Sequence, residues 1–408
     1  MRLVKIGIGI GLLLSLASLW AHAQPWEFDK PVNVTSSHGE KIFHHLESSG
    51  RHNIAISDGT VAVAWEDERD GTPRVYLARK DLDKQEFSKE VTISDKGEAF
   101  EPSLVALNNK RFVLAWEENS RIHLRVITQT NLGPTITLGN GEAVQPSLTI
   151  DDQQLLLVYS QREGRYGRIQ MQRIEIDGDK LHLKQGCAVD TEPAKDEQLY
   201  PSVVSVAGRV IVAWEDRRPG HTIIMAAQNH DRNSCRFDSP QRISEGASGQ
   251  RPAFGKGHGV SRVALAAYGT GKILAVWADK RDFREGYDIY AAHYLSSKDR
   301  LFGPNIKIQD SFGGLAQQWH AAVAGDPSGK LVVGWDDNRD GDANIMLSWP
   351  EGESWSEDFA VPGASGEGQQ NHPIISLDRE GNLHLAWIKR TTIGGPTQVH
   401  YLFGRGVK

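Results

Sequence analysis

Short segments in which apolar and polar residues alternate recur along the chain, and seven of them end in an aromatic residue. They read VAVAW to Trp65, FVLAW to Trp116, LLLVY to Tyr159, VIVAW to Trp214, ILAVW to Trp277, LVVGW to Trp335 and LHLAW to Trp387. Alternation with a period of two, bounded by Gly, Asp and Asn, predicts β-strands. Successive aromatic residues lie 43–63 residues apart, which matches one four-stranded propeller blade per copy.

The strands around each aromatic strand repeat as well. Several inner strands start with Pro-Ser, at Pro102, Pro146 and Pro201. The last copy stops after its third strand, near Phe403, whereas the segment PVNVTSS at 31–37 precedes the first copy without a partner. We therefore predict an all-β, seven-bladed β-propeller of four-stranded blades, closed into a ring by an N-terminal strand that completes the last blade.

The first 23 residues have the pattern of a secretory signal peptide. Two basic residues precede an apolar run that ends at Trp20, and an Ala-His-Ala cleavage site ends at Ala23. We expect cleavage after Ala23, export to the periplasm or beyond, and one propeller domain over residues 24–408. No later apolar run is long enough to span a bilayer.

Composition and charge exclude several other classes of protein. The 41 Gly and 17 Pro residues disfavour a helical bundle, and the 11 Trp residues disfavour disorder. With a formal charge of −6, the chain lacks the excess of basic residues that contacts with phosphates need, so we expect no nucleic-acid partner. The two cysteines, Cys187 and Cys235, could form one disulfide in an oxidising compartment, but the sequence leaves open whether they meet. We expect a monomer.

The loop after the aromatic residue repeats the pattern Trp-x-Asp-x-Arg in four copies. The Asp side chain can accept backbone N–H groups and fix the turn, and the Arg side chain can fork onto a carboxylate. A feature shared by four blades is more typical of scaffold than of a binding site. We assign this structural role to Asp67, Asp216, Asp279, Asp337, Arg69, Arg218, Arg281 and Arg339.

This aromatic-Asp-Arg pattern, with a strand of the Ile-Tyr kind after it, resembles the sialidase-like (neuraminidase-like) propeller superfamily over nearly the whole mature chain. The Asp-box of that family, Ser-x-Asp-x-Gly-x-Thr-Trp, lies between the third and fourth strands of a blade. Its nearest match here is Ser348, Gly352, Ser354 and Trp355, with Pro350 where Asp belongs. The resemblance implies the fold but not sialidase catalysis. True sialidases have six blades, and the first arginine of their substrate-binding triad lies in an Arg-Ile-Pro motif that this sequence lacks.

The loops that lead into the inner strands open around the mouth of the central channel, where propellers usually bind ligands. The residues at these positions differ between blades, and several are aromatic or amide types suited to a sugar or a peptide. Pro252 lies 25 residues before Trp277, whereas Pro201 lies 13 before Trp214, which predicts an insertion of 12 residues at this face of blade 5. The ligand-binding candidates are His44, His45, Glu101, Gln145, Tyr200, Arg251, His258, Trp319, His320, Asn371 and His372.

No cofactor is predicted, although two kinds of metal site are left open. Asp336, Asn338 and Asp340 match the start of a calcium loop, but Leu347 stands where the closing Glu belongs, which excludes an EF-hand and leaves only a looser calcium site. The histidines that could form a transition-metal site at the channel mouth are His44, His45, His320 and His372.

The sequence contains no evident nucleophile–base pair and no phosphate-binding or dinucleotide motif. We therefore predict an exported, non-catalytic propeller that binds a glycan, peptide or protein partner at its channel face. The alternative is a carbohydrate-active enzyme, a glycoside hydrolase or lyase. Its catalytic candidates are Glu101, Asp67, Asp279 and Tyr200, with Arg251 and His320 in anion-binding or acid–base roles. A metal-dependent or cofactor-bearing oxidoreductase is also left open.

Overall fold

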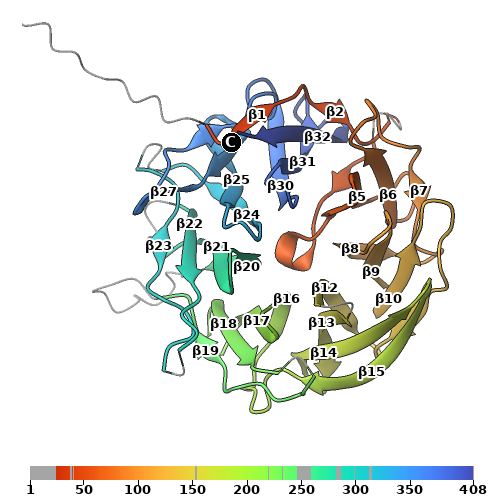
Figure 1. Ribbon diagram of the computed structural model, residues 1–408, viewed down its shortest axis with the longest axis vertical. Helices are drawn as coiled ribbons and strands as arrows, with labels where there is room; N and C mark the ends of the chain where they lie inside the picture. The colour runs from red at the N-terminus through yellow and green to blue at the C-terminus, as the bar shows by residue number, and fades with distance from the viewer. Residues whose placement is uncertain are drawn as a thin grey trace, which may run out of the picture.

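The computed structural model describes residues 24–407, apart from residues 37–38, 40, 152–153, 219, 232, 246–258, 282–285, 298 and 312–314. The predicted fold is confirmed: in the described part of the chain, seven antiparallel sheets stand as blades around a central channel (Figure 1). The predicted signal peptide, residues 1–23, lies outside the described residues. Among those that are described, no helix has the length and apolar character needed to cross a bilayer.

Each blade is a meander in which the strands follow one another outward from the channel. The inner strands of blades 2–7 are β8 (Ala99–Ala106), β12 (Ala143–Asp151), β16 (Gln198–Val206), β20 (Val260–Tyr268), β24 (Gln318–Gly325) and β30 (Gln369–Leu377). The second strands of blades 1–7 are β5 (Thr60–Asp67), β9 (Phe112–Glu118), β13 (Gln154–Glu163), β17 (Arg209–Asp216), β21 (Lys272–Asp279), β25 (Leu331–Asp340) and β31 (Leu383–Arg390). The third strands are β6 (Arg74–Asp81), β10 (Arg121–Ile127), β14 (Tyr166–Asp177), β18 (Ile223–Asn229), β22 (Asp288–His293), β26 (Asp342–Ser348) and β32 (Thr397–Gly406).

The outer strands are shorter and complete the blades. In blades 1–6 they are β7 (Val91–Thr92), β11 (Ile136–Leu138), β15 (Lys180–Ala188), β19 (Gln241–Arg242), β23 (Ile306–Lys307) and β29 (Phe359–Ala360). Blade 6 adds a hairpin, β27 (Pro350–Glu351) and β28 (Ser354–Trp355), between its third and fourth strands. We call the face at which the inner strands begin and the second strands end the proximal face, and the opposite face the distal face.

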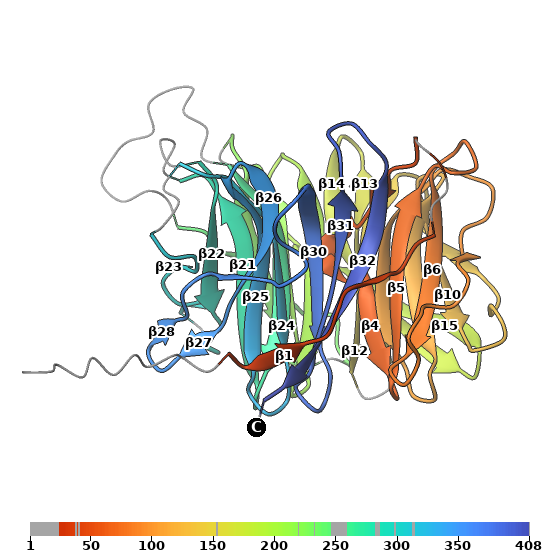
Figure 2. The same ribbon diagram turned by 90° about the horizontal axis from the view of Figure 1, so that it is seen from above.

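The N-terminal segment closes the ring, as predicted. Val32 and Asn33 of β2 (Val32–Asn33) pair with β32, and so does β1 (Trp26–Phe28), which precedes the predicted 31–37 segment (Figure 2). The two pieces are separated at Pro31, whose nitrogen has no hydrogen to donate to the ladder. Segments from both ends of the described chain, β1, β2 and β32, are therefore hydrogen-bonded to one another within blade 7, which closes the ring.

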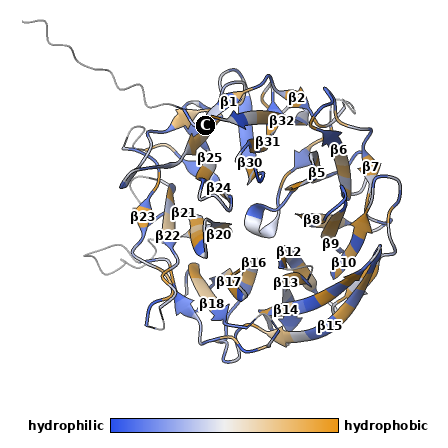
Figure 3. Ribbon diagram, viewed as in Figure 1, coloured by the Kyte–Doolittle hydropathy of each residue, from blue (hydrophilic) through white to orange (hydrophobic). Residues whose placement is uncertain are grey.

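The core fills the spaces between neighbouring blades rather than the channel. The aromatic residues at the ends of the second strands lie in these spaces, and the six tryptophans among them are fully buried. Figure 3 shows apolar and polar residues alternating along the strands, as expected for sheets that bury side chains on their packed faces. Each blade therefore depends on its two neighbours for burial.

The repeated Trp-x-Asp-x-Arg motif forms the structural unit that the sequence predicts. In blade 1, the indole N–H of Trp65 donates to Asp67 at 2.9 Å, and Arg69 Nε donates to the other oxygen of Asp67 at 2.7 Å. The same Trp–Asp and Arg–Asp contacts occur in blades 4, 5 and 6. The aspartate thus satisfies a buried indole donor and fixes the loop that follows the strand.

The start of blade 5 corrects one prediction. The inner strand β20 begins at Val260 rather than at Pro252, so Arg251 does not occupy the inner-strand position assigned to it. Arg262 occupies it, followed by Val263 where blades 2, 3, 4 and 7 have Pro. Because Pro-Ser marks the start of the inner strand in other blades, the sequence pattern places this start at Pro252, which is too early in the chain. Arg251 and His258 lie outside the described residues.

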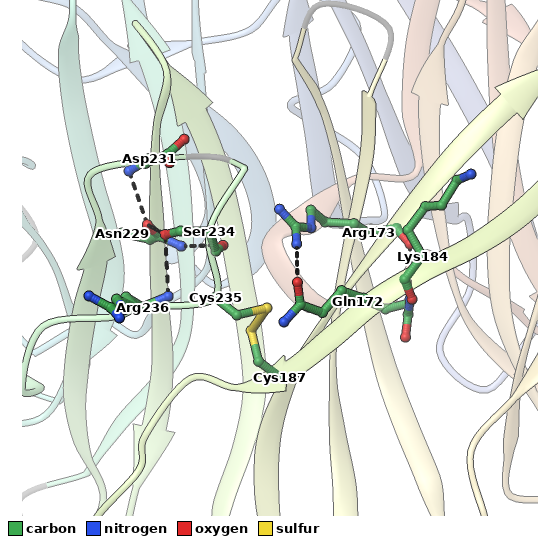
Figure 4. Close-up of a disulfide and its surroundings, with 10 residues drawn as sticks. Gln172, Arg173, Lys184, Cys187, Asn229, Asp231, Ser234, Cys235 and Arg236 are labelled. Carbon is green, nitrogen blue, oxygen red and sulfur yellow. Dashed lines mark hydrogen bonds between the residues drawn. A yellow bond between two sulfur atoms is a disulfide. The ribbon is translucent and has the colours of Figure 1, made fainter.

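Cys187 and Cys235 form a disulfide (Figure 4). Cys187 belongs to the outer strand of blade 3, and Cys235 belongs to the loop that follows the third strand of blade 4. The bond therefore ties two neighbouring blades together at the rim and closes a loop between residues 48 positions apart.

We expect the Cys187→Ser/Cys235→Ser double variant to lower the free energy of unfolding by about 2–4 kcal/mol, because the bond restricts the unfolded chain. Denaturant titration of the mature protein would measure the change. Wild-type protein under reducing conditions serves as the control and should show the same loss. Equal stability of the oxidised wild type and the double variant would contradict a contribution from this bond.

Candidate active site

Seven residues at equivalent positions surround the channel. Each lies 14 or 15 residues before the aromatic residue of its blade, and each has a left-handed backbone with φ between 50° and 63°. In blades 2–7 this residue sits at a β-bulge, where the register between inner and second strands shifts. Bulges redirect side chains. The seven residues are Arg51, Glu101, Gln145, Tyr200, Arg262, His320 and His372.

Blade 1 departs from the other six. Its inner strand is divided into β3 (His44–His45) and β4 (Ile54–Ser57), and the intervening segment 46–53, which includes η1 (Ser49–Arg51), extends into the channel. Figure 1 shows this segment as the orange coil at the centre of the ring. It brings Glu47 and Arg51 among the side chains from the other blades.

Oxygen atoms from neighbouring blades hold the bulges in place. The backbone N–H of Glu101 donates to Glu66 at 2.9 Å, that of Arg262 donates to Glu215 at 2.7 Å, and that of His372 donates to Asp336 at 2.8 Å. Each acceptor directly follows the tryptophan of the preceding blade. In blade 4, the backbone N–H of Tyr200 donates instead to the side-chain amide oxygen of Gln145, which belongs to blade 3, at 2.9 Å.

Burial and the charges of nearby carboxylates raise the pKa values of several glutamates in the channel. Burial, followed by the charge of Glu101, raises the pKa of Glu66 well above its ordinary value and the pKa of Glu117 to about 7. Burial is also the main reason that the pKa values of Glu101 and Glu215 are raised. The proximal channel therefore contains carboxyl groups that keep their protons at higher pH than free side chains do.

Arg262 lies between two of the channel carboxylates. Its Nη1 is 3.0 Å from Glu101 Oε1, and its Nη2 is 3.7 Å from Glu47 Oε2. The guanidinium group stacks on the ring of Tyr200, with its carbon 3.7 Å from the ring centroid. One cation thus fixes two carboxylates and an aromatic ring in a single arrangement.

A second group contains His320, His372, Asp336 and Glu47. His320 Nδ1 is 2.6 Å from Asp336 Oδ2, and His372 Nδ1 is 2.8 Å from Glu47 Oε1. The two imidazole rings face each other, with their centroids 3.8 Å apart. Although burial opposes it, the contact with His372 and the charge of Arg51 hold the pKa of Glu47 well below its ordinary value.

Aromatic side chains lie beside these charged groups. Trp319 packs against Tyr287, with ring centroids 3.9 Å apart, and its other neighbour is His320. Both Trp319 and Tyr287 are partly exposed. Such faces, next to charged groups, suit the apolar side of a sugar ring.

The distal half of the channel differs in character. It holds a cavity of about 530 Å³ lined mostly by apolar residues near the ends of the inner strands, such as Leu107, Ile150 and Leu377. Arg51 and His52 line this cavity from the inserted segment. Apart from Arg51, none of the described charged residues near the bulges lines this cavity.

The structure brings together five of the predicted ligand-binding residues in the proximal channel, namely Glu101, Gln145, Tyr200, His320 and His372. Trp319 is adjacent, and Asn371 is partly exposed beside His372. His44 is buried and contacts Thr397, whereas His45 is exposed at the edge of β3.

The remaining predicted residues take other places. The catalytic candidates Asp67 and Asp279 are fully buried in the Trp-x-Asp-x-Arg units. All three calcium candidates belong to β25: Asp336 contacts both histidines in the channel, Asn338 accepts a hydrogen bond from the N–H of Gln317, and Asp340 is exposed.

Sequence reasoning missed several channel residues. Arg51 and Arg262 share the 14–15-residue spacing to the aromatic residue, so that spacing could have identified both. The carboxylates Glu66, Glu117 and Glu215 directly follow the aromatic residue and could have been found by the same alignment, whereas Asp336, at the same position, was considered only as a calcium ligand. Glu47 lies in a segment that departs from the repeat, and no periodic signal identifies it.

Comparisons with known proteins find the fold but no family. No protein-family model and no curated protein matches the sequence. The solved structure of the polysaccharide lyase Uly1 is 11% identical, with a TM-score of 0.53 over 88% of this chain and 90% of that one. The α-L-arabinofuranosidase Arb93A from Fusarium graminearum is 12% identical, with a TM-score of 0.51 over 74% of this chain and 92% of its own. Likeness at these identities shows a shared fold.

The prediction of a non-catalytic binding module is corrected by these findings. The two solved structures reported above are a lyase and a glycosidase rather than binding modules. The prediction also relied on the absence of an evident catalytic pair, but Glu101 and Glu47 meet on one guanidinium group. The alternative, a carbohydrate-active enzyme, is therefore the better supported interpretation.

The raised pKa of Glu117 gives a pH-dependent prediction. Glu117 ionises near its ordinary value of 4.5 in the unfolded chain and near 7 in the folded protein. The folded protein therefore keeps a proton that the unfolded chain releases, and this side chain lowers the free energy of unfolding as pH rises from about 4.5 to 7. We expect Glu117→Gln, which retains an acceptor oxygen, to be more stable than the wild type at pH 8 by about 1–3 kcal/mol but not at pH 4.5.

Denaturant titrations of both proteins across this pH range would measure the difference. Glu98→Gln, at an exposed position before the same inner strand as Glu101, is the control and should parallel the wild type. A Glu117→Gln variant with the wild-type pH dependence would show that this carboxyl group titrates normally.

Proposed function

We propose that this protein is a carbohydrate-active enzyme that cleaves glycosidic bonds at the proximal side of its channel, with Glu101 as the proton donor. The observation that carries the proposal is the placement of Glu101 and Glu47 on either side of Arg262. Glycoside hydrolases generally use two carboxyl groups that flank the bond to be broken, one of which donates a proton to the leaving oxygen.

Glu101 has the properties of the proton donor. Burial raises its pKa, whereas the charge of Arg262 opposes the shift. The side chain is still 12% exposed, so a substrate can reach it. The guanidinium group of Arg262 fixes the orientation of the Glu101 carboxyl group. A proton donor needs such orientation because the leaving oxygen must lie within hydrogen-bond distance.

Glu47 supplies the second carboxylate from the inserted segment. Its side chain is 23% exposed, as is that of Arg262. Tyr200, Trp319 and Tyr287 surround the two carboxylates with aromatic faces that can pack on a sugar ring. The similar folds of an arabinofuranosidase and a polysaccharide lyase support this class of substrate.

A lyase reaction is the second candidate, favoured by the pairing of Arg262 with Tyr200. In this reaction, the arginine would neutralise a uronate carboxylate, a base would remove the proton beside it, and the glycosidic C–O bond would break as a C=C bond forms. His320, oriented by Asp336, is a candidate for this base. The fold similarity to a polysaccharide lyase over 88% of this chain supports this alternative.

We further propose that the chain is exported and belongs to the sialidase-like superfamily in the broad sense. The Trp-x-Asp-x-Arg units and the β27–β28 hairpin, at the place where that family has its Asp-box, support the relationship. The disulfide supports an oxidising compartment.

We expect Glu101→Gln to reduce kcat at least about 100-fold on a glycan that the wild type cleaves, because the amide cannot donate a carboxylic proton. The wild type would first be screened on arabinans, arabinoxylans and uronate polysaccharides. Reducing ends without a new ultraviolet absorbance would indicate hydrolysis, and a conjugated unsaturated product would indicate elimination.

Two controls separate acid catalysis from a structural role. The loss should shrink on an aryl glycoside with a good leaving group, which departs without protonation. Glu98→Gln should retain the wild-type rate. If Glu101→Gln cleaves the natural glycan as fast as the wild type, Glu101 is not the proton donor.

A further inference from the structure

We propose that Glu47, His320 and His372 bind a divalent transition-metal ion, and that Zn²⁺ matches their ligand chemistry. These side chains each offer one ligand atom, and the three atoms lie within 4.8 Å of one another. They come from three separate elements: the inserted segment of blade 1 and the bulges of blades 6 and 7. Two imidazoles and one carboxylate form a ligand set used by catalytic zinc sites.

The distances allow the three ligands to close on one ion. Zinc–ligand bonds of about 2.0–2.1 Å in a tetrahedral site place the ligand atoms about 3.3 Å apart. His372 Nδ1 and Glu47 Oε1 are already 2.8 Å apart. Atoms up to 4.8 Å apart would need to approach by about 1.5 Å, which small side-chain rotations can provide in partly exposed residues.

Asp336 is the supporting residue that such a site requires. Its Oδ2 lies 2.6 Å from His320 Nδ1 and accepts the backbone N–H of His372 at 2.8 Å. When Nδ1 of His320 donates to Asp336, its Nε2 carries the lone pair and is available to a metal. This carboxylate–histidine pairing is a regular feature of metal sites, because it orients the ring and increases its basicity.

The charged groups around these three ligands have opposite effects on the binding of a cation. Glu47 and Asp336 favour a cation, whereas Arg51 and Arg262 oppose it. Three protein ligands leave at least one coordination position for water or substrate. A bound ion would share Glu47 with the proposed catalytic site and so lie close to Glu101, but its binding can be measured without a substrate.

Calorimetric titration of Zn²⁺ into the mature, untagged, metal-stripped protein tests the proposal. We expect one ion per chain, and at least tenfold weaker binding by His320→Ala and by His372→Ala. Asp336→Asn should weaken binding about 10–100-fold through His320. His182→Ala, at an exposed position on β15, is the matched control and should bind as the wild type does. Wild-type affinity in a folded His320→Ala/His372→Ala variant would overturn the proposal.

X-ray absorption of the Zn²⁺-loaded wild type gives a second test that does not depend on any variant folding. We expect scattering from two imidazole rings and nitrogen or oxygen ligands at about 2.0–2.1 Å. A zinc spectrum without imidazole scattering would overturn the proposal, as would failure of the folded wild type to bind Zn²⁺. Neither result would affect the test of Glu101, which measures glycan cleavage.

Discussion

The channel depends on one recurring interaction: a side-chain oxygen of one blade holds the backbone N–H of a left-handed residue in the next. A non-glycine residue in this conformation costs about 1–2 kcal/mol, and a hydrogen bond inside a protein contributes about 0.5–1.5 kcal/mol. The interaction therefore offsets the strain of a bulge that directs a functional side chain inward. It also joins neighbouring blades at their inner edges, where the apolar contacts between sheets end.

The same interaction determines the electrostatics of the channel. Acceptors such as Glu66 and Glu215 must be buried to reach the bulges, and burial raises their pKa values. Several carboxyl groups then share a small volume, which makes the channel attractive to cations. Arg262 provides one cation from within the chain, and the placement of Glu101 and Glu47 follows from its position. The arrangement of charged groups that we propose to be catalytic is thus a consequence of how the scaffold is held together.

The sequence predicts the fold well because propeller geometry repeats every feature. The aromatic residue, its alternating strand and the Asp and Arg that follow recur, and each copy corroborates the others. The segment at 31–37 could be recognised as the closing strand because only one blade lacked an outer strand. The site was predicted less well. Proline was used to mark the inner strands, but Val263 replaces it in blade 5, and Arg262 was missed for that reason.

Glu47 illustrates a deeper limit of sequence reasoning, since its position follows from a break in the repeat. The inner strand of blade 1 leaves the blade pattern between His45 and Ile54 and crosses the channel instead of forming a bulge. The two carboxylate oxygens of Glu47 then face different partners: Oε2 faces Arg262 and Oε1 faces His372. One side chain therefore joins the Arg262 group to the histidine pair. A symmetric ring could not make this connection, because equivalent residues on seven blades lie around the channel wall rather than at its centre. The insertion in blade 1 is thus what turns a ring of separate polar residues into one connected site.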